Sequence, residues 1–192
     1  MAYRLRHGQT FLYDDSSDDI VGIRDIDGSE FLWARKPELG VFFDTSNQAA
    51  FGGFVSTMFF NTAVIERGVR LVSDLTSKFY VDRAGLYNWQ LSVHLHNTDS
   101  QAHFFELWGR KNGDDIANSR FIYTVPSSHG GEPGTLIPSQ NFWLQLAAGD
   151  YVEIMWTSDN AGVTIAYHAA EVGPPAKPAA PSLLLTVNRV DD

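Results

Sequence analysis

Apolar and polar residues alternate along short segments of this chain, with the period of two that a β-strand gives its side chains. In the segment Leu86–His96, Leu91 and Val93 fall on one side. Ser92 and His94 fall on the other. No convincing 3.6-residue period lies between such segments, so the pattern indicates strands rather than helices.

Evenly spaced β-prone runs follow one another from Thr62 onward. Turn formers such as Asn112-Gly113 and Ala148-Gly149-Asp150 divide them. Many short strands spaced in this way predict an antiparallel sandwich or barrel. The predicted strands are Thr62–Ile65, Arg70–Ser73, Lys78–Val81, Gly85–His96, Ala102–Lys111, Asp115–Val125, Thr135–Leu146, Tyr151–Thr157, Val163–Ala170 and Ser182–Val190.

The first fifty residues have a different character. Asp27-Gly28 is a strong turn signal, so Ile20 to Trp33 predicts a small β-hairpin. A short strand at Gly40–Phe43 follows, and the Gly-rich stretch Thr45–Thr57 is interpreted as a linker. We therefore predict an N-terminal arm that contains a β-hairpin, over residues 1–50, and a main β domain over residues 51–192.

Several predicted strands are apolar or aromatic on both faces. In Tyr151–Thr157, for example, Trp156 lies on one face while Tyr151 and Met155 lie on the other. In a monomeric sandwich, one face of each sheet is expected to be exposed to solvent and therefore polar. A second apolar face therefore indicates an oligomer interface.

The charge balance excludes some partners. The 192 residues carry 14 Lys and Arg against 23 Asp and Glu, a formal net charge of -9. Nucleic-acid affinity comes largely from cations that neutralise phosphates, so neither nucleic acid nor an anionic membrane is an expected partner. The acidic run from Asp14 to Asp19 is interpreted as a solvated loop, because it lacks the glycine and distal glutamate of a calcium loop.

The chain has no cysteine, which excludes disulfides and thiolate chemistry. No apolar stretch is long enough to span a bilayer, and the N-terminus lacks the apolar core of a signal peptide. We therefore expect synthesis in a cytosol without export through the secretory pathway.

The six histidines are the candidates for a transition-metal site. His94 and His96 share a strand face, and a turn could bring His103 beside them. Three imidazoles on one face would suit zinc or nickel. Without a recognisable carboxylate partner or ligand spacing, a hydrogen-bonded surface cluster is the favoured interpretation, and no cofactor is predicted.

No pattern in the sequence indicates an enzyme. Ser127-Ser128-His129-Gly130-Gly131 lacks the elbow of a serine hydrolase, and adjacent Ser and His rarely have the geometry for proton transfer. The aromatic residues are more typical of core and interface than of a sugar-binding platform, although glycan binding by the loops at one end stays open.

Two motifs resemble the C1q/TNF-like jelly rolls. Gly85 to Ser92 is similar to their G-x-Y-x-x-x-x-S strand, and Leu146 to Val152 is similar to their L-x-x-G-D-x-V turn. The C-terminus lacks the F-x-G-x-L ending of that superfamily, so its ligand positions are not transferred. The resemblance implies an antiparallel jelly-roll sandwich that forms homotrimers.

A wider resemblance is to virion structural proteins of tailed phages, cyanophages especially. It covers roughly Thr62 to Val190 and rests on a series of motifs in order. These are Gly85–Asn97, W-x-R-K-N-G at Trp108, V-P-S-x-H-G-G at Val125, G-D-Y-V-E-I-M-W at Gly149 and P-S-L-L-L-T-V at Pro181. The segment Ile20–Glu30 also resembles the V-G-I-x-x-P-D-G-S-E start of small phage proteins, with Ile26 at the proline position.

This resemblance implies a capsid decoration (cement) protein on the outer surface of the virion, with the major capsid protein and its own copies as partners. The alternative is a receptor- or glycan-binding head of a tail fibre or spike. Residues expected to contact the capsid are Tyr3, Arg4, Arg6, Ile20, Ile23, Arg24, Phe31, Trp33 and Arg35. Residues expected at the trimer interface are Tyr87, Trp89, Phe104, Trp108, Tyr151 and Met155.

Overall fold

The computed structural model describes residues 10–14, 19–24, 30–32, 37–50, 53–72 and 76–190, with side chains from residue 37 onward. The chain divides into two units, Met1–Pro37 and Glu38–Asp192. All regular secondary structure in the described residues is β-strand, and every strand pairing is antiparallel. The predicted all-β, antiparallel class is therefore confirmed.

The N-terminal unit is a three-stranded sheet with the order β1-β2-β3. Its strands are β1 (Thr10–Asp14), β2 (Asp19–Arg24) and β3 (Glu30–Leu32). The β2–β3 pair is the predicted hairpin, and β1 adds a third strand with a register shift between Leu12 and Tyr13.

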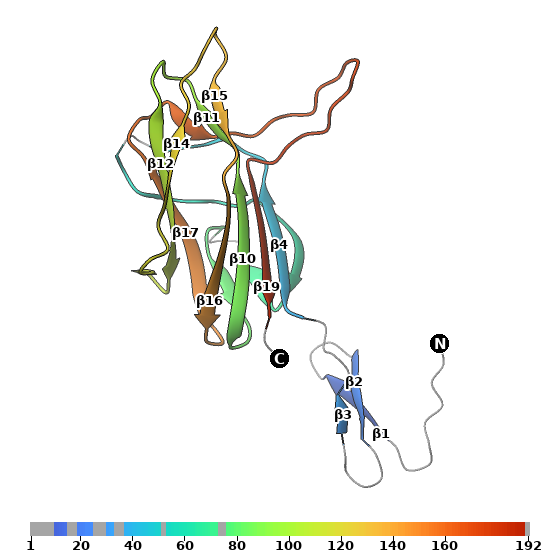
Figure 1. Ribbon diagram of the computed structural model, residues 1–192. Helices are drawn as coiled ribbons and strands as arrows, with labels where there is room; N and C mark the ends of the chain where they lie inside the picture. Colours follow the sequence, from blue (N-terminus) through green and yellow to red (C-terminus); the bar gives the residue numbers. More distant parts are fainter. Residues whose placement is uncertain are drawn as a thin grey trace. The chain divides into compact units, whose positions relative to one another are not determined.

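The main unit contains a five-stranded sheet, ordered β16-β10-β19-β4-β7 (Figure 1). These strands are β16 (Ser139–Leu146), β10 (Gly85–Val93), β19 (Leu183–Arg189), β4 (Leu39–Asp44) and β7 (Thr62–Arg67). The last strand of the chain therefore lies in the middle of the sheet, between β10 and β4.

A seven-stranded sheet faces it across the core, with the path β13-β12-β17-β9-β8. Its strands are β13 (Asp114–Asp115), β12 (His103–Lys111), β17 (Tyr151–Ser158), β9 (Phe79–Val81) and β8 (Val69–Leu71), with β14 (Phe121–Val125) on β12 and β6 (Ser56–Thr57) on β17. A four-stranded sheet contains β15 (Gly134–Leu136), β11 (Leu95–Asn97), β18 (Val163–Ile165) and β5 (Gln48–Ala49).

The main strand pairs are nested along the chain. The outermost pair is β4 with β19, and inside it β9 pairs with β17. The next pair is β10 with β16, and the innermost is β12 with β14. The chain therefore runs out and back as one long antiparallel ribbon that is folded into two layers.

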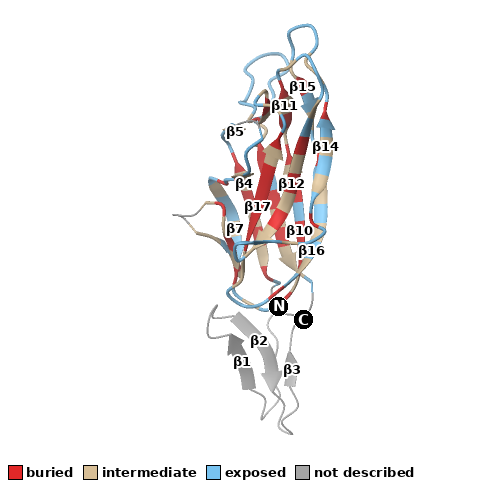
Figure 2. Ribbon diagram, turned by 90° about the vertical axis from the view of Figure 1, so that its left-hand side faces the viewer, coloured by how far each residue is buried: buried red, intermediate tan, exposed pale blue. Residues whose placement is uncertain are grey.

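The core lies between the two layers and is rich in aromatic residues (Figure 2). Phe79 contacts the rings of Phe42, Phe60 and Trp89 at centroid distances of 4.9, 5.0 and 5.9 Å. All four side chains have 0% exposure. Burying one large apolar side chain contributes about 1.5–3 kcal/mol, so this cluster is a major source of stability.

Several predicted boundaries need correction. The predicted strand Gly85–His96 is interrupted at His94, where β10 passes from the five-stranded to the four-stranded sheet as β11. The predicted strand Asp115–Val125 is split into β13 and β14. The predicted Asn112-Gly113 turn is present, and both residues have the positive φ angles, 53° and 95°, that a tight hairpin turn requires.

The predicted boundary at residue 50 lies too far along the chain. The two units meet after Pro37, and β4 and β5 belong to the main unit. The local sequence around Gly40 does not show that β4 belongs to the main unit, because the strand that β4 pairs with is β19, far away in the sequence. The predicted linker Thr45–Thr57 contains β5 and β6.

The stretch between β18 and β19 forms an exposed hairpin, which Figure 1 shows extending away from the sheets in orange and red. Its backbone bridges join His168 to Ala180 and Glu171 to Lys177. Every residue from Ala169 to Ala179 is exposed. The predicted β-strand Val163–Ala170 therefore ends early, and the proline-rich connector is an arm rather than a strap across the sandwich. We call residues 168–180 the hairpin arm.

Candidate functional site

The outward side of the five-stranded sheet is the first candidate surface. In β10 the inward side chains are Tyr87, Trp89, Leu91 and Val93, which are 0–1% exposed. The positions between them point outward, and the strand register extends that face across β16, β19 and β4. The outward positions are Leu86, Asn88, Gln90, Ser92, Ser139, Asn141, Trp143, Gln145, Leu184, Thr186, Asn188, Leu39, Val41 and Phe43.

None of these outward positions carries a charge, and we call the surface that they form the uncharged face. Trp143 is 54% exposed and Leu184 is 41% exposed, although both are large apolar side chains. Trp143 lies directly across from Asn88, and Leu184 lies between Ser92 and Phe43. An uncharged sheet surface with exposed apolar side chains is typical of the centre of a protein interface.

The outward side of the seven-stranded sheet carries charged groups beside exposed apolar side chains such as Phe104 and Ile122, and we call it the charged face. An ion pair joins Arg120 to Glu106 at 2.7 Å, and another joins Arg110 to Asp115 at 2.8 Å. The ammonium group of Lys78 lies 4.4 Å from the centre of the Tyr151 ring. These charged groups have partners within the chain and stay hydrated.

Three of the six residues predicted for the trimer interface are buried inside the single chain. Tyr87 and Trp89 are 0% exposed, because both point into the core. Met155 is 3% exposed, since β6 pairs with β17 beside it and Trp108 lies directly across from it. These three predictions are wrong, because no side chain buried in its own core is free to meet a second copy.

The other three residues predicted for the trimer interface lie on the charged face. Phe104 is 52% exposed. Trp108 is half-buried, and its indole N–H donates to Asp115 Oδ1 at 2.9 Å. Tyr151 is half-buried against Tyr80, with a ring distance of 5.2 Å. Trp108 and Tyr151 therefore make contacts within the chain, and the predicted set does not form one continuous surface.

The residues predicted for capsid contact belong to the N-terminal unit. Ile20, Ile23 and Arg24 lie in β2 and Phe31 lies in β3, where only the backbone is described. The remaining predicted residues lie outside the described ones: Tyr3, Arg4, Arg6, Trp33 and Arg35. Their role stays a prediction.

A cavity of about 340 Å³ lies at the base of the hairpin arm. His94, His96 and His168 line it together with residues of β15 and of the arm. The Nε2 atoms of His96 and His168 are 3.1 Å apart, and the His94 and His168 rings are 5.6 Å apart. The predicted pairing of His94 with His96 is therefore present, but the third imidazole is His168.

Burial lowers the pKa of both His94 and His96, and the neighbouring His168 lowers each further. The neutral imidazole is therefore favoured at this cavity, because a charged ring would lose hydration there and would be repelled by the next ring. Within the residues that the structure describes, no three His, Asp or Glu side chains already surround one point as metal ligands.

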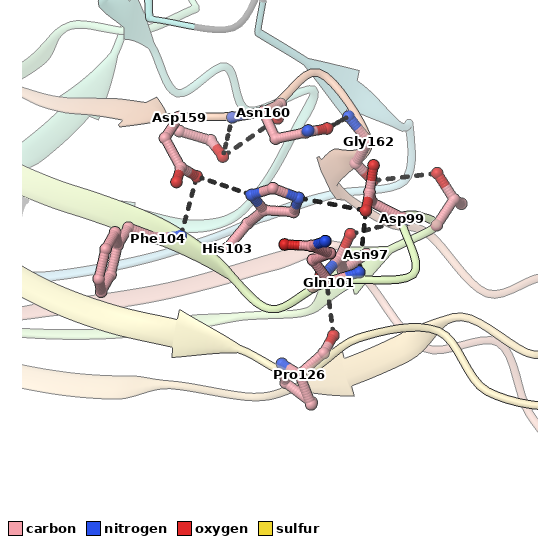
Figure 3. A network of polar contacts seen from close by, with 11 residues as sticks. Asn97, Asp99, Gln101, His103, Phe104, Pro126, Asp159, Asn160 and Gly162 are labelled. Atoms are coloured by element: carbon pink, nitrogen blue, oxygen red, sulfur yellow. Dashed lines mark hydrogen bonds and ion pairs between the residues drawn. The ribbon is translucent and has the colours of Figure 1, made fainter.

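His103 lies elsewhere, in a polar network between two loops (Figure 3). Its Nε2 atom is 3.5 Å from Asp99 Oδ1, and its Nδ1 atom is 3.4 Å from Asp159 Oδ1. Asp159 also accepts a hydrogen bond from the backbone N–H of Phe104 at 2.9 Å. A hydrogen bond from the Gln101 backbone N–H lowers the pKa of Asp99, and His103 lowers it further. This network joins the loops before β12 and after β17, and it is a structural clamp.

Sequence reasoning missed His168 because it is 72 residues from His96 in the chain. No spacing rule connects the two residues, and only the pairing of β11 with β18 brings the segment that follows β18 beside His96. The burial of Tyr87 and Trp89, by contrast, was predictable from the sequence. The same alternation that puts Leu91 inside also puts these two aromatic residues inside.

No protein-family model matches this chain, and no curated protein matches it either. The described residues contain no helix of the length and apolar character needed to cross a membrane.

Proposed function

We propose that this protein decorates the capsid of a tailed phage as a homotrimer and stabilises the shell by binding neighbouring capsid subunits. The observation that carries the proposal is that the chain consists of two units of different construction. A small three-stranded unit precedes a sandwich that has its own core and an uncharged, partly apolar sheet face. In this proposal the sandwich forms the trimer and the N-terminal unit binds the shell.

The nested strand pairs support a jelly-roll topology for the sandwich. A jelly roll is an antiparallel ribbon of eight strands folded into two sheets, so its first strand pairs with its last and its fourth with its fifth. The pairs β4–β19, β9–β17, β10–β16 and β12–β14 follow this rule. In this scheme β7 is a fifth strand added beside β4, and the short additions or continuations are β5, β6, β8, β11, β13, β15 and β18.

The uncharged face is the proposed trimer interface. Its residues replace the buried aromatic ones expected from the sequence, with Trp143 and Leu184 as the central contacts. A stable interface buries about 800 Å² on each partner, and the uncharged face extends over four neighbouring strands. Because the face carries no charge, burying it leaves no charged group without water or a partner.

The N-terminal unit is the proposed capsid-binding element. A three-stranded sheet has edge strands whose backbone groups can pair with a strand of another protein. The predicted contacts in β2 and β3, with the arginines near the N-terminus, add apolar and charged groups to such pairing. In this proposal the assembly has a mechanical function, because the bound trimer resists the separation of neighbouring capsid subunits.

The test removes residues 1–37 and leaves the sandwich from Glu38 onward intact. This cut follows the boundary between the units, whereas a cut at residue 50 would remove β4 and β5 from the sheets. We expect the truncated protein to remain trimeric in light scattering and to lose co-sedimentation with purified undecorated capsids. Full co-sedimentation of the truncated protein would refute the role of the N-terminal unit.

The alternative function is a receptor- or glycan-binding head of a tail fibre, and the hairpin arm is the observation that favours it. Exposed loops at one end of a rigid sandwich often carry recognition, and Val172 near the tip of the arm is fully exposed. Binding of the full chain to host cells or to a glycan array, together with no binding to capsids, would establish this alternative in place of decoration.

A further inference from the structure

The cavity at the base of the hairpin arm gathers three imidazoles from two distant segments of the chain. His94 lies between β10 and β11, His96 lies in β11, and His168 opens the hairpin arm. His94 and His96 are half-buried, while His168 is exposed. The rings therefore face a space that solvent and small ions can enter.

The two closest ring nitrogens have the separation of a metal-ligand pair. His96 Nε2 and His168 Nε2 are 3.1 Å apart. A tetrahedral zinc ion with Zn–N bonds of about 2.0–2.1 Å holds two imidazole nitrogens about 3.3 Å apart. Without a metal, the same spacing lets one neutral ring donate a hydrogen bond to the other. The two nitrogens therefore have nearly the separation of a ligand pair before an ion binds.

The backbone around these rings is fixed by hydrogen bonds. His96 is paired on both sides, with β15 and with β18. The His94 N–H donates to the Ser182 carbonyl at 2.9 Å, and His168 exchanges two backbone hydrogen bonds with Ala180. Only side-chain rotation is therefore needed to adjust the rings around an ion.

The third ring lies within reach of the same point. The His94 and His168 rings are 5.6 Å apart, so a change of rotamer can turn a His94 nitrogen toward the other two. Glu171 also lines the cavity, but its carboxylate is held by Lys177 at 2.8 Å on the hairpin arm. The imidazoles are thus the available donors, and they suit zinc, copper or nickel, whereas calcium and magnesium require oxygen ligands.

We infer that His96 and His168, with His94 as the third ligand, bind one divalent transition-metal ion of the zinc type. The ion ties the hairpin arm to β11, so the arm is anchored in the metal-bound protein. This inference is independent of the capsid role, since it rests on residues of the sandwich alone.

The experiment measures zinc binding to the full chain by isothermal titration calorimetry. We expect one zinc ion per chain for the wild type. In His96→Gln and His168→Gln the affinity falls by at least about 100-fold, because each variant removes a ligand. The matched control is His129→Gln, which removes an exposed histidine outside the cavity and leaves the zinc affinity unchanged.

A second measurement distinguishes loss of the site from loss of the fold. Cobalt(II) added to the wild type is expected to give the visible absorption of a tetrahedral ion, while thermal melts of the metal-free variants match the wild type. Zinc is also expected to raise the melting temperature of the wild type but not of His96→Gln. Absence of zinc binding in the wild type, or unchanged affinity in both ligand variants, would overturn the inference.

Discussion

The two large sheets share one core and differ on their outward faces. The uncharged face of the five-stranded sheet exposes Trp143 and Leu184, and the outward positions of β16, β10, β19 and β4 carry no charged residue. The charged face of the seven-stranded sheet carries the Arg120–Glu106 and Arg110–Asp115 ion pairs. Both faces expose some apolar side chains, so the property that separates the two surfaces is charge.

The difference shows which face another chain can cover at low cost. Covering the charged face would strip water from ions whose partners already lie within the chain, and such desolvation costs several kcal/mol per ion. Covering the uncharged face removes apolar surface from water and leaves no ion buried. The aromatic content of a strand does not by itself show which face forms an interface, because Tyr87 and Trp89 are aromatic and yet lie in the core.

The largest expected effect comes from placing charge on the uncharged face. We expect the double substitution Trp143→Glu and Leu184→Glu to convert the proposed trimer into monomers, because each proposed interface would then bury uncompensated carboxylates. Multi-angle light scattering at micromolar concentration measures the mass directly. The control is Ile122→Glu on β14, where a side chain of the seven-stranded sheet is 55% exposed, and it is expected to leave the mass unchanged. Monomers in the control and trimers in the double variant would reverse the assignment of the two faces.

A smaller effect is expected from Asp150, in the turn between β16 and β17. Its carboxylate accepts hydrogen bonds from Asn112 Nδ2 at 2.7 Å and from the Ala147 N–H at 2.8 Å, and these bonds lower its pKa. Replacement by Asn is expected to reduce the free energy of unfolding by about 1 kcal/mol at pH 7.

The pH dependence of that loss follows from the direction of the shift. A lowered folded-state pKa contributes stability above the unfolded pKa of about 3.9, and this contribution is lost as the pH falls through the folded value. The difference between wild type and Asp150→Asn is therefore expected to be constant above about pH 5 and to shrink toward zero in stronger acid. Urea unfolding at several pH values measures it, and a difference that grows on acidification would contradict this account.

The smallest effect is expected from the ion pairs of the charged face. Glu106→Gln removes one partner of Arg120, whose side chain is 59% exposed. Because exposed pairs contribute little and are screened by salt, the loss of stability is expected to be smaller than for Asp150→Asn and to vanish in high salt. Urea unfolding in low and high salt tests this, with Arg120→Gln as the reciprocal variant. A large, salt-independent loss would mean that this face is not simply a solvated surface.

Much of the secondary structure follows from local patterns. The strands around Leu91, Leu107 and Ile154 were predicted close to their observed positions, because an alternating pattern and flanking turn formers are local properties. The turn at Asn112-Gly113 was predictable for the same reason, since two positive φ angles favour these two residue types. By contrast, the unit boundary was misplaced, because β4 looks like part of the N-terminal arm until its pairing with β19 is known.

The candidate sites were less predictable than the strands. His94 and His96 share a face by alternation alone, so their pairing was within reach of the sequence. His103 was expected as their neighbour, yet it lies between Asp99 and Asp159. The sequence suggested a hairpin that would bring His103 near, but β12 pairs with β14 and β17 rather than with β11.

The sequence by itself determined that this chain forms antiparallel strands, where most of them lie, and which side of each strand is apolar. The tertiary structure alone decided which strands are neighbours, that the uncharged face is left open, and that His168 meets His96. The reason is physical: alternation and turn formation depend on residues a few positions apart, whereas sheet order and side-chain clusters depend on contacts between residues far apart in the chain.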